Sequence, residues 1–346
     1  MNRKILLVVL VISMLIFSAC NQAESSEKNS AGAQDGTVTL KLAGMSAADH
    51  PSTVTMNEFA ERVYEETDGR VEIDIFPSNQ LGDWSNVYQE IARGTIEMGL
   101  ITHPTEQDSR AELLGFPFIA TGYDDIEKAF GRESYIFKKI EEINEETGIT
   151  LLAFYGEEFG GLGTVKEVEN IDKVGAEKDI LIRTPSLDLQ VEMMKGLGFR
   201  TTTIPFADLY SALQTGVADG WIGGGPTYNY TGFRDVIKYY YQINDQFIAT
   251  PLFINTEVFQ QLNEEDRETM QKIAEEIMNG SFLAAQDNEE KYRQLLIEEG
   301  IEVIELSDSQ IEAFAEFART EMWPQFAERV GEDIINELIE YLDEAE

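Results

Sequence analysis

Cysteine and histidine are nearly absent from this sequence. The chain of 346 residues contains one cysteine and two histidines. One cysteine cannot form an internal disulfide or supply the thiolates of a structural zinc site. Neither His50 nor His103 lies in a His-Glu-x-x-His motif, and there is no G-x-S-x-G elbow or G-x-x-x-x-G-K-[ST] phosphate loop. We therefore expect no enzyme activity, no cofactor and no metal site.

Basic residues are also scarce. The chain has 26 Lys and Arg against 64 Asp and Glu, which gives a formal net charge of −38. Such a surface repels phosphate backbones and excludes nucleic acid as a partner. The hydrophobic fraction of 43% is too high for a disordered acidic chain. The length predicts roughly two folded domains, at about 150 residues each.

A long apolar run occurs only at the N-terminus. Two basic residues precede the run at 5–17, and Ser18, Ala19 and Cys20 follow it. This order is typical of a secretory signal peptide, and the run is short for a membrane-spanning helix, which needs about 20 residues. The sequence Phe17-Ser18-Ala19-Cys20 resembles a bacterial lipobox, in which the cysteine becomes the lipidated N-terminus.

We therefore predict a lipoprotein signal peptide at 1–19, lipidation at Cys20 and a flexible lipid-anchored tether at 20–36, which is small and polar. The alternative is an ordinary signal peptide with a chance cysteine. The prediction places the protein on the extracytoplasmic face of the cell membrane, held there by its lipid anchor.

The rest of the chain alternates between strand and helix patterns. Period-two or apolar runs predict strands at 38–42, 71–76, 96–101, 149–155, 179–184, 217–223 and 235–242. Helical patterns lie between them at 53–67, 85–93, 187–196 and 206–214. This order predicts an α/β fold with a largely parallel sheet.

A long helical pattern follows at 264–299. A helix over this range would be about 54 Å long at 1.5 Å per residue, longer than one small domain is wide. We predict that it braces two domains, although Gly280 interrupts it. Two more helices are expected at about 308–329 and 332–344.

Five fragments carry a family resemblance. They are AGMSAADHPST (43–53), EIDIFPSNQLGDWSNVYQEIARGTIEMGL (72–100), LGFPF (114–118), ILIRTPS (180–186) and IPFADLYSALQTGVADGW (204–221). In this order they resemble the substrate-binding proteins of tripartite ATP-independent periplasmic (TRAP) transporters, the DctP-like family, over about 38–340.

The resemblance implies an α/β, two-domain periplasmic-binding-protein-like (Venus-flytrap) fold with a long helix bridging both domains. Domain I would comprise 37–155 plus about 248–285, and domain II 156–247 plus about 300–346, with the spanning helix at about 264–299. It also implies a cleft that closes around a small ligand, and delivery of that ligand to the TRAP permease subunits in the membrane.

Arg183 is the leading candidate for ligand binding. In the resembled family the arginine of the R-x-P motif pairs with a substrate carboxylate, and a guanidinium fork can hold a carboxylate bidentately. Arg183 also ends an apolar strand, where open α/β sheets present ligand groups. A structural salt bridge is the alternative. The other candidate substrate-binding residues, each of which could instead be a packed or solvent-facing residue, are His50, Trp84, Thr102, His103, Tyr155, Glu158, Phe206, Trp221 and Gly223.

One departure from the family pattern bears on the ligand. Many members have Gly-Phe-Arg after the strand that matches 149–155, but here Glu158-Phe159-Gly160-Gly161 follows and no arginine appears. A second carboxylate would lack its partner, and an unpaired buried charge is costly. We therefore expect a monocarboxylate, hydroxylated or sugar-derived, covered by aromatic side chains.

The sequence thus predicts a monomeric solute-binding protein that captures a small organic acid by cleft closure and passes it to a TRAP permease. Two alternatives share the same fold. One is a binding module that presents the carboxylate to a membrane sensor, and the other is a secreted enzyme.

Overall fold

The computed structural model describes residues 36–344. The predicted signal peptide, the lipidation site Cys20 and all but the last residue of the predicted tether therefore lie outside the described residues. The sheet and the helices belong to a compact unit that begins at Thr37. Among the helices at 36–344, none combines the length and the apolar character needed to cross a membrane.

The described residues form one mixed sheet in the order β2-β1-β3-β8-β4-β7-β5-β6, with β9 also paired to β8. The strands are β1 (Val38–Gly44), β2 (Val71–Phe76), β3 (Met98–Leu100), β4 (Ile149–Thr164), β5 (Leu181–Thr184), β6 (Arg200–Thr203), β7 (Gly220–Gly224), β8 (Tyr239–Asn255) and β9 (Glu302–Glu305). Strands β1–β3 are parallel to one another, and so are β5–β7 where they pair.

The prediction of a largely parallel sheet misses the two longest strands. β4 and β8, with 16 and 17 residues, pair antiparallel along their length. The C-terminal part of β8 pairs with β3, and the C-terminal part of β4 pairs with β7. These two crossing strands therefore connect a first lobe, built on β1–β3, to a second lobe, built on β5–β7.

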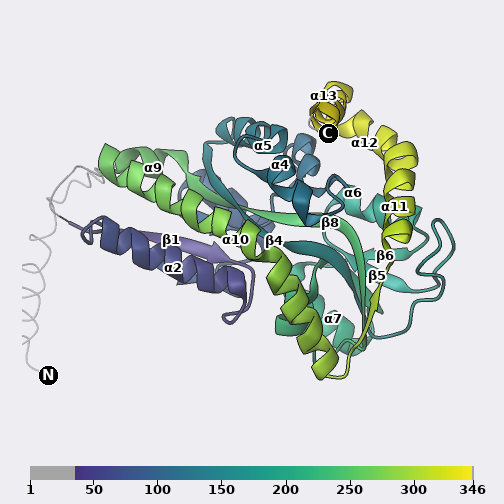
Figure 1. Cartoon of the computed structure of the whole chain (residues 1–346). Coiled ribbons are helices and arrows are strands. Elements are labelled where there is room, and N and C mark those ends of the chain that lie inside the picture. Colours follow the sequence, from purple (N-terminus) through teal and green to yellow (C-terminus); the bar gives the residue numbers. More distant parts are fainter. Residues whose placement is uncertain (1–35, 345–346) are drawn as a thin grey trace, which may run out of the picture. The chain divides into compact units, whose positions relative to one another are not determined.

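Helices surround the sheet in both lobes (Figure 1). They are α2 (Pro51–Glu66), α3 (Trp84–Arg93), α4 (Ile126–Phe130), α5 (Tyr135–Glu145), α6 (Asp188–Gly196), α7 (Leu209–Thr215), α8 (Pro226–Tyr228), α9 (Thr256–Gln261), α10 (Glu264–Glu298), α11 (Asp308–Phe317), α12 (Trp323–Val330) and α13 (Glu332–Glu344). The predicted helix at 308–329 is divided into α11 and α12 by a π-helical turn at 318–322, and Pro324 is the second residue of α12.

Helix α10 bridges the two lobes, as the sequence predicts. It has 35 residues, and the Asn263 side chain caps its N-terminus by accepting a hydrogen bond from the Asp266 amide. Glu276 pairs with Arg62 of α2 at 2.7 Å, and Tyr292 packs against Tyr230, with ring centroids 5.6 Å apart. Figure 1 shows α10 running across the crossing strands with a bend near its middle.

The middle of α10 contacts β4 where the chain passes between the lobes. The Gly156 amide donates to Ser281 Oγ at 2.8 Å, and a Cβ at Gly156 would lie 2.9 Å from Phe282 Cγ. Only glycine leaves room for this approach, since real Cβ contacts are longer. The brace therefore contacts the crossing strands directly as well as each lobe.

Candidate functional site

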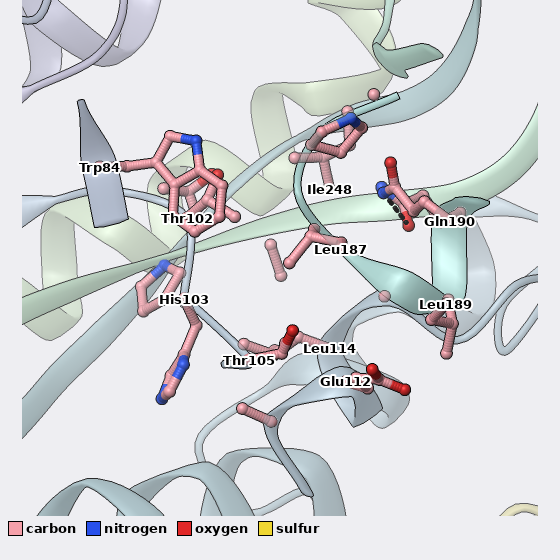
Figure 2. A pocket seen from close by; sticks show the side chains of 18 of the residues that line it. Trp84, Thr102, His103, Thr105, Glu112, Leu114, Leu187, Leu189, Gln190 and Ile248 are labelled. Carbon is pink, nitrogen blue, oxygen red and sulfur yellow. Dashed lines mark hydrogen bonds between the residues drawn. The ribbon is translucent and has the colours of Figure 1, made fainter. Parts of the chain in front are cut away.

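A cavity opens among the first lobe, the second lobe and the crossing strands. Its volume is about 110 Å³, which suits a small molecule. Its lining comprises Met45, Trp84, Thr102, His103, Thr105, Ala111, Glu112, Leu114, Gly115, Glu157, Arg183, Pro185, Leu187, Leu189, Gln190, Phe206, Gly223, Tyr228 and residues 246–251. Figure 2 shows Trp84, Thr102 and His103 on one side of this space and Leu189 and Gln190 on the other.

Arg183 brings a buried positive charge to the cavity. It lies on β5 and its exposed fraction is 2%. Its Nε donates to the Ile204 carbonyl at 2.7 Å, and the guanidinium carbon lies 5.9 Å from the Phe206 ring centroid. Among residues 36–344, Arg183 forms no ion pair and its terminal nitrogens have no hydrogen-bond acceptor. Burial lowers the pKa of Arg183 to about 10, so it stays charged at neutral pH.

Aromatic side chains form much of the remaining surface. Trp84 opens α3 and is 4% exposed. Phe206 packs edge-on against Tyr228, with centroids 5.9 Å apart. Apolar walls exclude water and thereby strengthen hydrogen bonds between a ligand and the few polar groups of the cavity.

His103 contributes its ring but no free nitrogen. Its Nδ1 lies 2.7 Å from the Pro104 carbonyl, and Asn144 Nδ2 lies 3.1 Å from its Nε2. Burial lowers the pKa of His103 to about 4, so the imidazole is neutral, donates from Nδ1 and accepts at Nε2. Within the described part of the chain, no three His, Cys, Asp or Glu side chains are placed to hold a metal ion.

The structure brings six of the ten predicted ligand-binding residues to the cavity. They are Trp84, Thr102, His103, Arg183, Phe206 and Gly223. The other four lie outside the lining. Tyr155 is 4% exposed, Glu158 Oε1 and Oε2 accept from the Thr227 amide and hydroxyl at 2.7 Å each, and Trp221 Nε1 donates to Asn229 Oδ1 at 3.0 Å.

The fourth, His50, is connected to the cavity through a buried hydrogen-bond chain. His50 Nδ1 caps α2 and lies 2.7 Å from Ser52 Oγ, which is 3.0 Å from Ser46 Oγ. Ser46 Oγ is in turn 2.8 Å from Tyr228 Oη, and that hydroxyl donates to Glu157 at 3.3 Å. This chain of hydrogen bonds runs from the first lobe, through Tyr228 of α8, to the lining residue Glu157.

Several polar residues of the lining are missing from the predicted set, and Glu157 and Gln190 are two of them. Glu157, on β4, is 6% exposed, and Gln190, on α6, is 3% exposed. Each lies in a segment whose sequence pattern predicts buried side chains. A polar residue at such a buried position is the signal that could have identified Glu157 and Gln190. Thr250 on β8 lies beside Glu157 and donates to its Oε1 at 2.6 Å.

Asp245, next to the lining residue Gln246, gives the protein a pH-dependent stability. Its exposed fraction is 0%, and neither carboxyl oxygen has a hydrogen-bond partner among the described residues. Burial raises its pKa to about 7. Because the native state holds this proton more tightly than the unfolded chain, the free energy of unfolding falls as pH rises from about 4 through about 7.

We expect Asp245→Asn to remove this loss, which amounts to roughly 4 kcal/mol at most. Urea denaturation of wild type and variant at pH 5 and pH 8 measures it: the variant should gain stability chiefly at pH 8. The exposed Asp287→Asn on α10 is the matched control and should show no such difference. An equal effect of Asp245→Asn at both pH values would contradict the interpretation.

Two lobes that share crossing strands, with a cavity and an unpaired buried charge where they meet, define a ligand-binding protein of the hinge-closing type. The chain belongs to the DctP family: the model of the bacterial extracellular solute-binding protein family 7 matches residues 42–329. The family, the fold class and the solute-binding role predicted from the sequence are thereby confirmed.

Individual proteins are also similar to this chain. A solute-binding protein of Chromohalobacter salexigens is 25% identical over 268 residues, covering 75% of this chain and 76% of that protein. A TRAP periplasmic solute-binding protein of Haemophilus influenzae, crystallised with L-gulonate, superimposes with a TM-score of 0.77 at 23% identity, over 88% of this chain and 99% of the other. One from Desulfovibrio salexigens, with orotic acid, gives 0.79 at 20% identity, over 88% and 97%.

Proposed function

We propose that this protein captures a small monocarboxylate in the cavity by closure of the two lobes and delivers it to a TRAP permease. The observation that carries the proposal is Arg183, a buried guanidinium with free donors in the lining. A buried unpaired cation is costly, and a ligand carboxylate would offset that cost through bidentate hydrogen bonds. The relatives crystallised with L-gulonate and orotic acid also hold organic acids.

The charges of the lining favour one carboxylate rather than two. Arg183 is the single Lys or Arg among the lining residues, and the lining also contains two acidic residues, Glu112 and Glu157. Glu112 is neutralised by Arg329 at 2.8 Å. A second ligand carboxylate would therefore be buried without a cation and close to acidic groups.

The proposal includes the context in which the protein works. The chain would be anchored through a lipid at Cys20 on the extracytoplasmic face of the membrane, as a monomer that performs no reaction on its ligand. Domain I would comprise 37–155 plus about 248–285 and domain II 156–247 plus about 300–346. The pairing of β4 and β8 with both lobes supports a passage between domains near residues 155 and 248.

A thermal-shift screen tests the ligand class. We expect one or more small monocarboxylates to raise the melting temperature, whereas the corresponding uncharged amides should not. A ligand at 100 times its Kd adds about 2.7 kcal/mol to the free energy of unfolding. Amides that stabilise the protein as well as their acids, or dicarboxylates that outperform every monocarboxylate, would contradict the proposal.

A further inference from the structure

Glu157 lines the cavity, and its carboxyl has an unmet polar requirement that is opposite in sign to that of Arg183. Its Oε1 accepts hydrogen bonds from Thr250 Oγ1 at 2.6 Å and from Tyr228 Oη at 3.3 Å. Its Oε2 is buried and has no partner among the described residues. Because both donors to Oε1 are neutral hydroxyls, no group of the described chain compensates a charge on this carboxylate.

The buried surroundings of the Glu157 carboxyl favour its uncharged, protonated form. Burial raises its pKa to about 7, and the hydrogen bonds from Thr250 and Tyr228 oppose this rise without cancelling it. A cationic hydrogen-bond donor at Oε2 would pair with the ionised form and remove the desolvation cost. Among the groups that a small ligand can carry, a protonated amine or amidine has both the charge and the N–H.

Gln190 also has a buried oxygen that lacks a hydrogen-bond donor. Its Nε2 donates to Gln246 Oε1 at 3.2 Å, but its own Oε1 is buried and lacks a partner among residues 36–344. Figure 2 shows Gln190 at the side of the cavity, with this bond dashed. A buried amide oxygen without a hydrogen bond costs about 1–3 kcal/mol, so a ligand with more than one N–H could satisfy both oxygens.

We propose that the ligand is zwitterionic: a small acid that also carries a cationic N–H group, with its carboxylate on Arg183 and its N–H donated to Glu157 Oε2. This inference rests on the proposed function, because it assumes that Arg183 holds a carboxylate. The lining offers one unpaired cation and one unpaired carboxyl from different elements, β5 and β4. A ligand with one charge of each sign matches both.

The charge of the whole chain agrees with this assignment. A formal net charge of −38 creates a field that opposes the approach of an anion. A zwitterion has no net charge and therefore meets no such barrier. Once bound, it compensates the cation and the acid together, whereas a simple anion leaves Glu157 unpaired.

The test compares acids that differ in a single group. Binding is measured by calorimetry for L-alanine and L-lactate, β-alanine and 3-hydroxypropionate, 4-aminobutyrate and 4-hydroxybutyrate, and L-phenylalanine and L-3-phenyllactate. In at least one pair, the amino acid should bind wild type at least about tenfold more tightly than the hydroxy acid, as expected for a hydrogen bond between charged groups.

Glu157→Gln should reduce that preference about tenfold or more. Glu289→Gln is the matched control. Glu289 is also a buried acid, but it lies outside the lining, and its Oε2 already accepts from Tyr123 at 2.7 Å and from the Phe159 amide at 3.3 Å. It should leave the preference unchanged.

The outcomes separate this inference from the proposed function. Hydroxy acids that bind as tightly as, or more tightly than, their amino partners in every pair would overturn the zwitterion and leave a carboxylate on Arg183. A preference for the amino acid that persists in Glu157→Gln would overturn the role of Glu157. If neither these acids nor the wider screen of organic acids stabilises wild type, both proposals fail. If Glu157→Gln does not fold, the comparison of amino acids with hydroxy acids on the wild type still tests whether the ligand is zwitterionic.

Discussion

Arg183→Ala should abolish ligand binding and leave the protein folded. The variant removes the single Lys or Arg of the cavity lining, and with it two or more charge-assisted hydrogen bonds to the ligand carboxylate. At about 1.5–3 kcal/mol for each hydrogen bond to a charged group, the affinity should fall by roughly two orders of magnitude or more. The ligand-induced rise in melting temperature should disappear accordingly.

The same variant should not destabilise the ligand-free protein. The guanidinium is desolvated and, in the described structure, its only protein hydrogen bond is the one from Nε to the Ile204 carbonyl. Its removal eliminates a buried charge that has no ion-pair partner among the described residues, which offsets the lost hydrogen bond and the lost contact with Phe206. Opposite effects on ligand-free stability and on ligand response would distinguish this role from that of a structural arginine.

Two further variants complete the experiment. Arg183→Lys keeps the charge but loses the planar fork, so affinity should be intermediate between wild type and Arg183→Ala. Arg200→Ala, on the neighbouring β6, removes a largely exposed arginine paired with Asp179 at 3.4 Å and should bind ligand as wild type does. An Arg183→Ala protein with unchanged affinity would refute the assignment of the carboxylate site.

Trp221→Ala should cause a large loss of stability, about 3–5 kcal/mol. Trp221 is 1% exposed, donates to Asn229 Oδ1 and packs against Phe233, with ring centroids 4.8 Å apart. Truncation would leave a cavity in the core of the second lobe and an unsatisfied amide oxygen. The urea midpoint measures the loss, and Tyr210→Ala, a large and exposed side chain in the same lobe, should change it by less than about 1 kcal/mol.

Trp221→Phe separates support from direct contact. Trp221 lies outside the cavity lining but touches Phe206, which is part of it, with centroids 6.1 Å apart. A supporting role predicts a reduced midpoint and a change in ligand affinity of a few fold. A large loss of affinity in Trp221→Phe at unchanged stability would instead show that the indole contacts the ligand, as the sequence pattern suggested.

The features that depend on local sequence were predictable. Helix α10 was expected at 264–299 and spans Glu264–Glu298, because Asn263 caps its start and Gly300, with a φ of 84°, ends it. Arg183 is predicted as a ligand residue because its R-x-P sequence matches the motif of the resembled family and because it ends an apolar strand. Both signals lie within a few residues of the feature that they predict.

The features that depend on segments far apart in the chain could not be predicted from the sequence. From residue 156 onward, β4 contains Gly156, Gly160, Gly161 and Gly163, and this composition hides any strand pattern. Glycine is required there by packing: a Cβ at Gly163 would lie 2.0 Å from Asn229 Oδ1. Because that partner is 66 positions away in the chain, neither the continuation of the predicted strand beyond residue 155 nor the cavity position of Glu157 could be deduced from local periodicity.

The crossing strands also determine how the molecule can come apart. The chain leaves the first lobe through β4, builds the second lobe and returns through β8 to pair with β3. Neither lobe is therefore a continuous piece of sequence, and each depends on strands that the other also uses. Loss of one lobe would remove hydrogen bonds from the other, so the two should melt together in one cooperative transition, even though the proposed capture of a ligand requires them to move against each other.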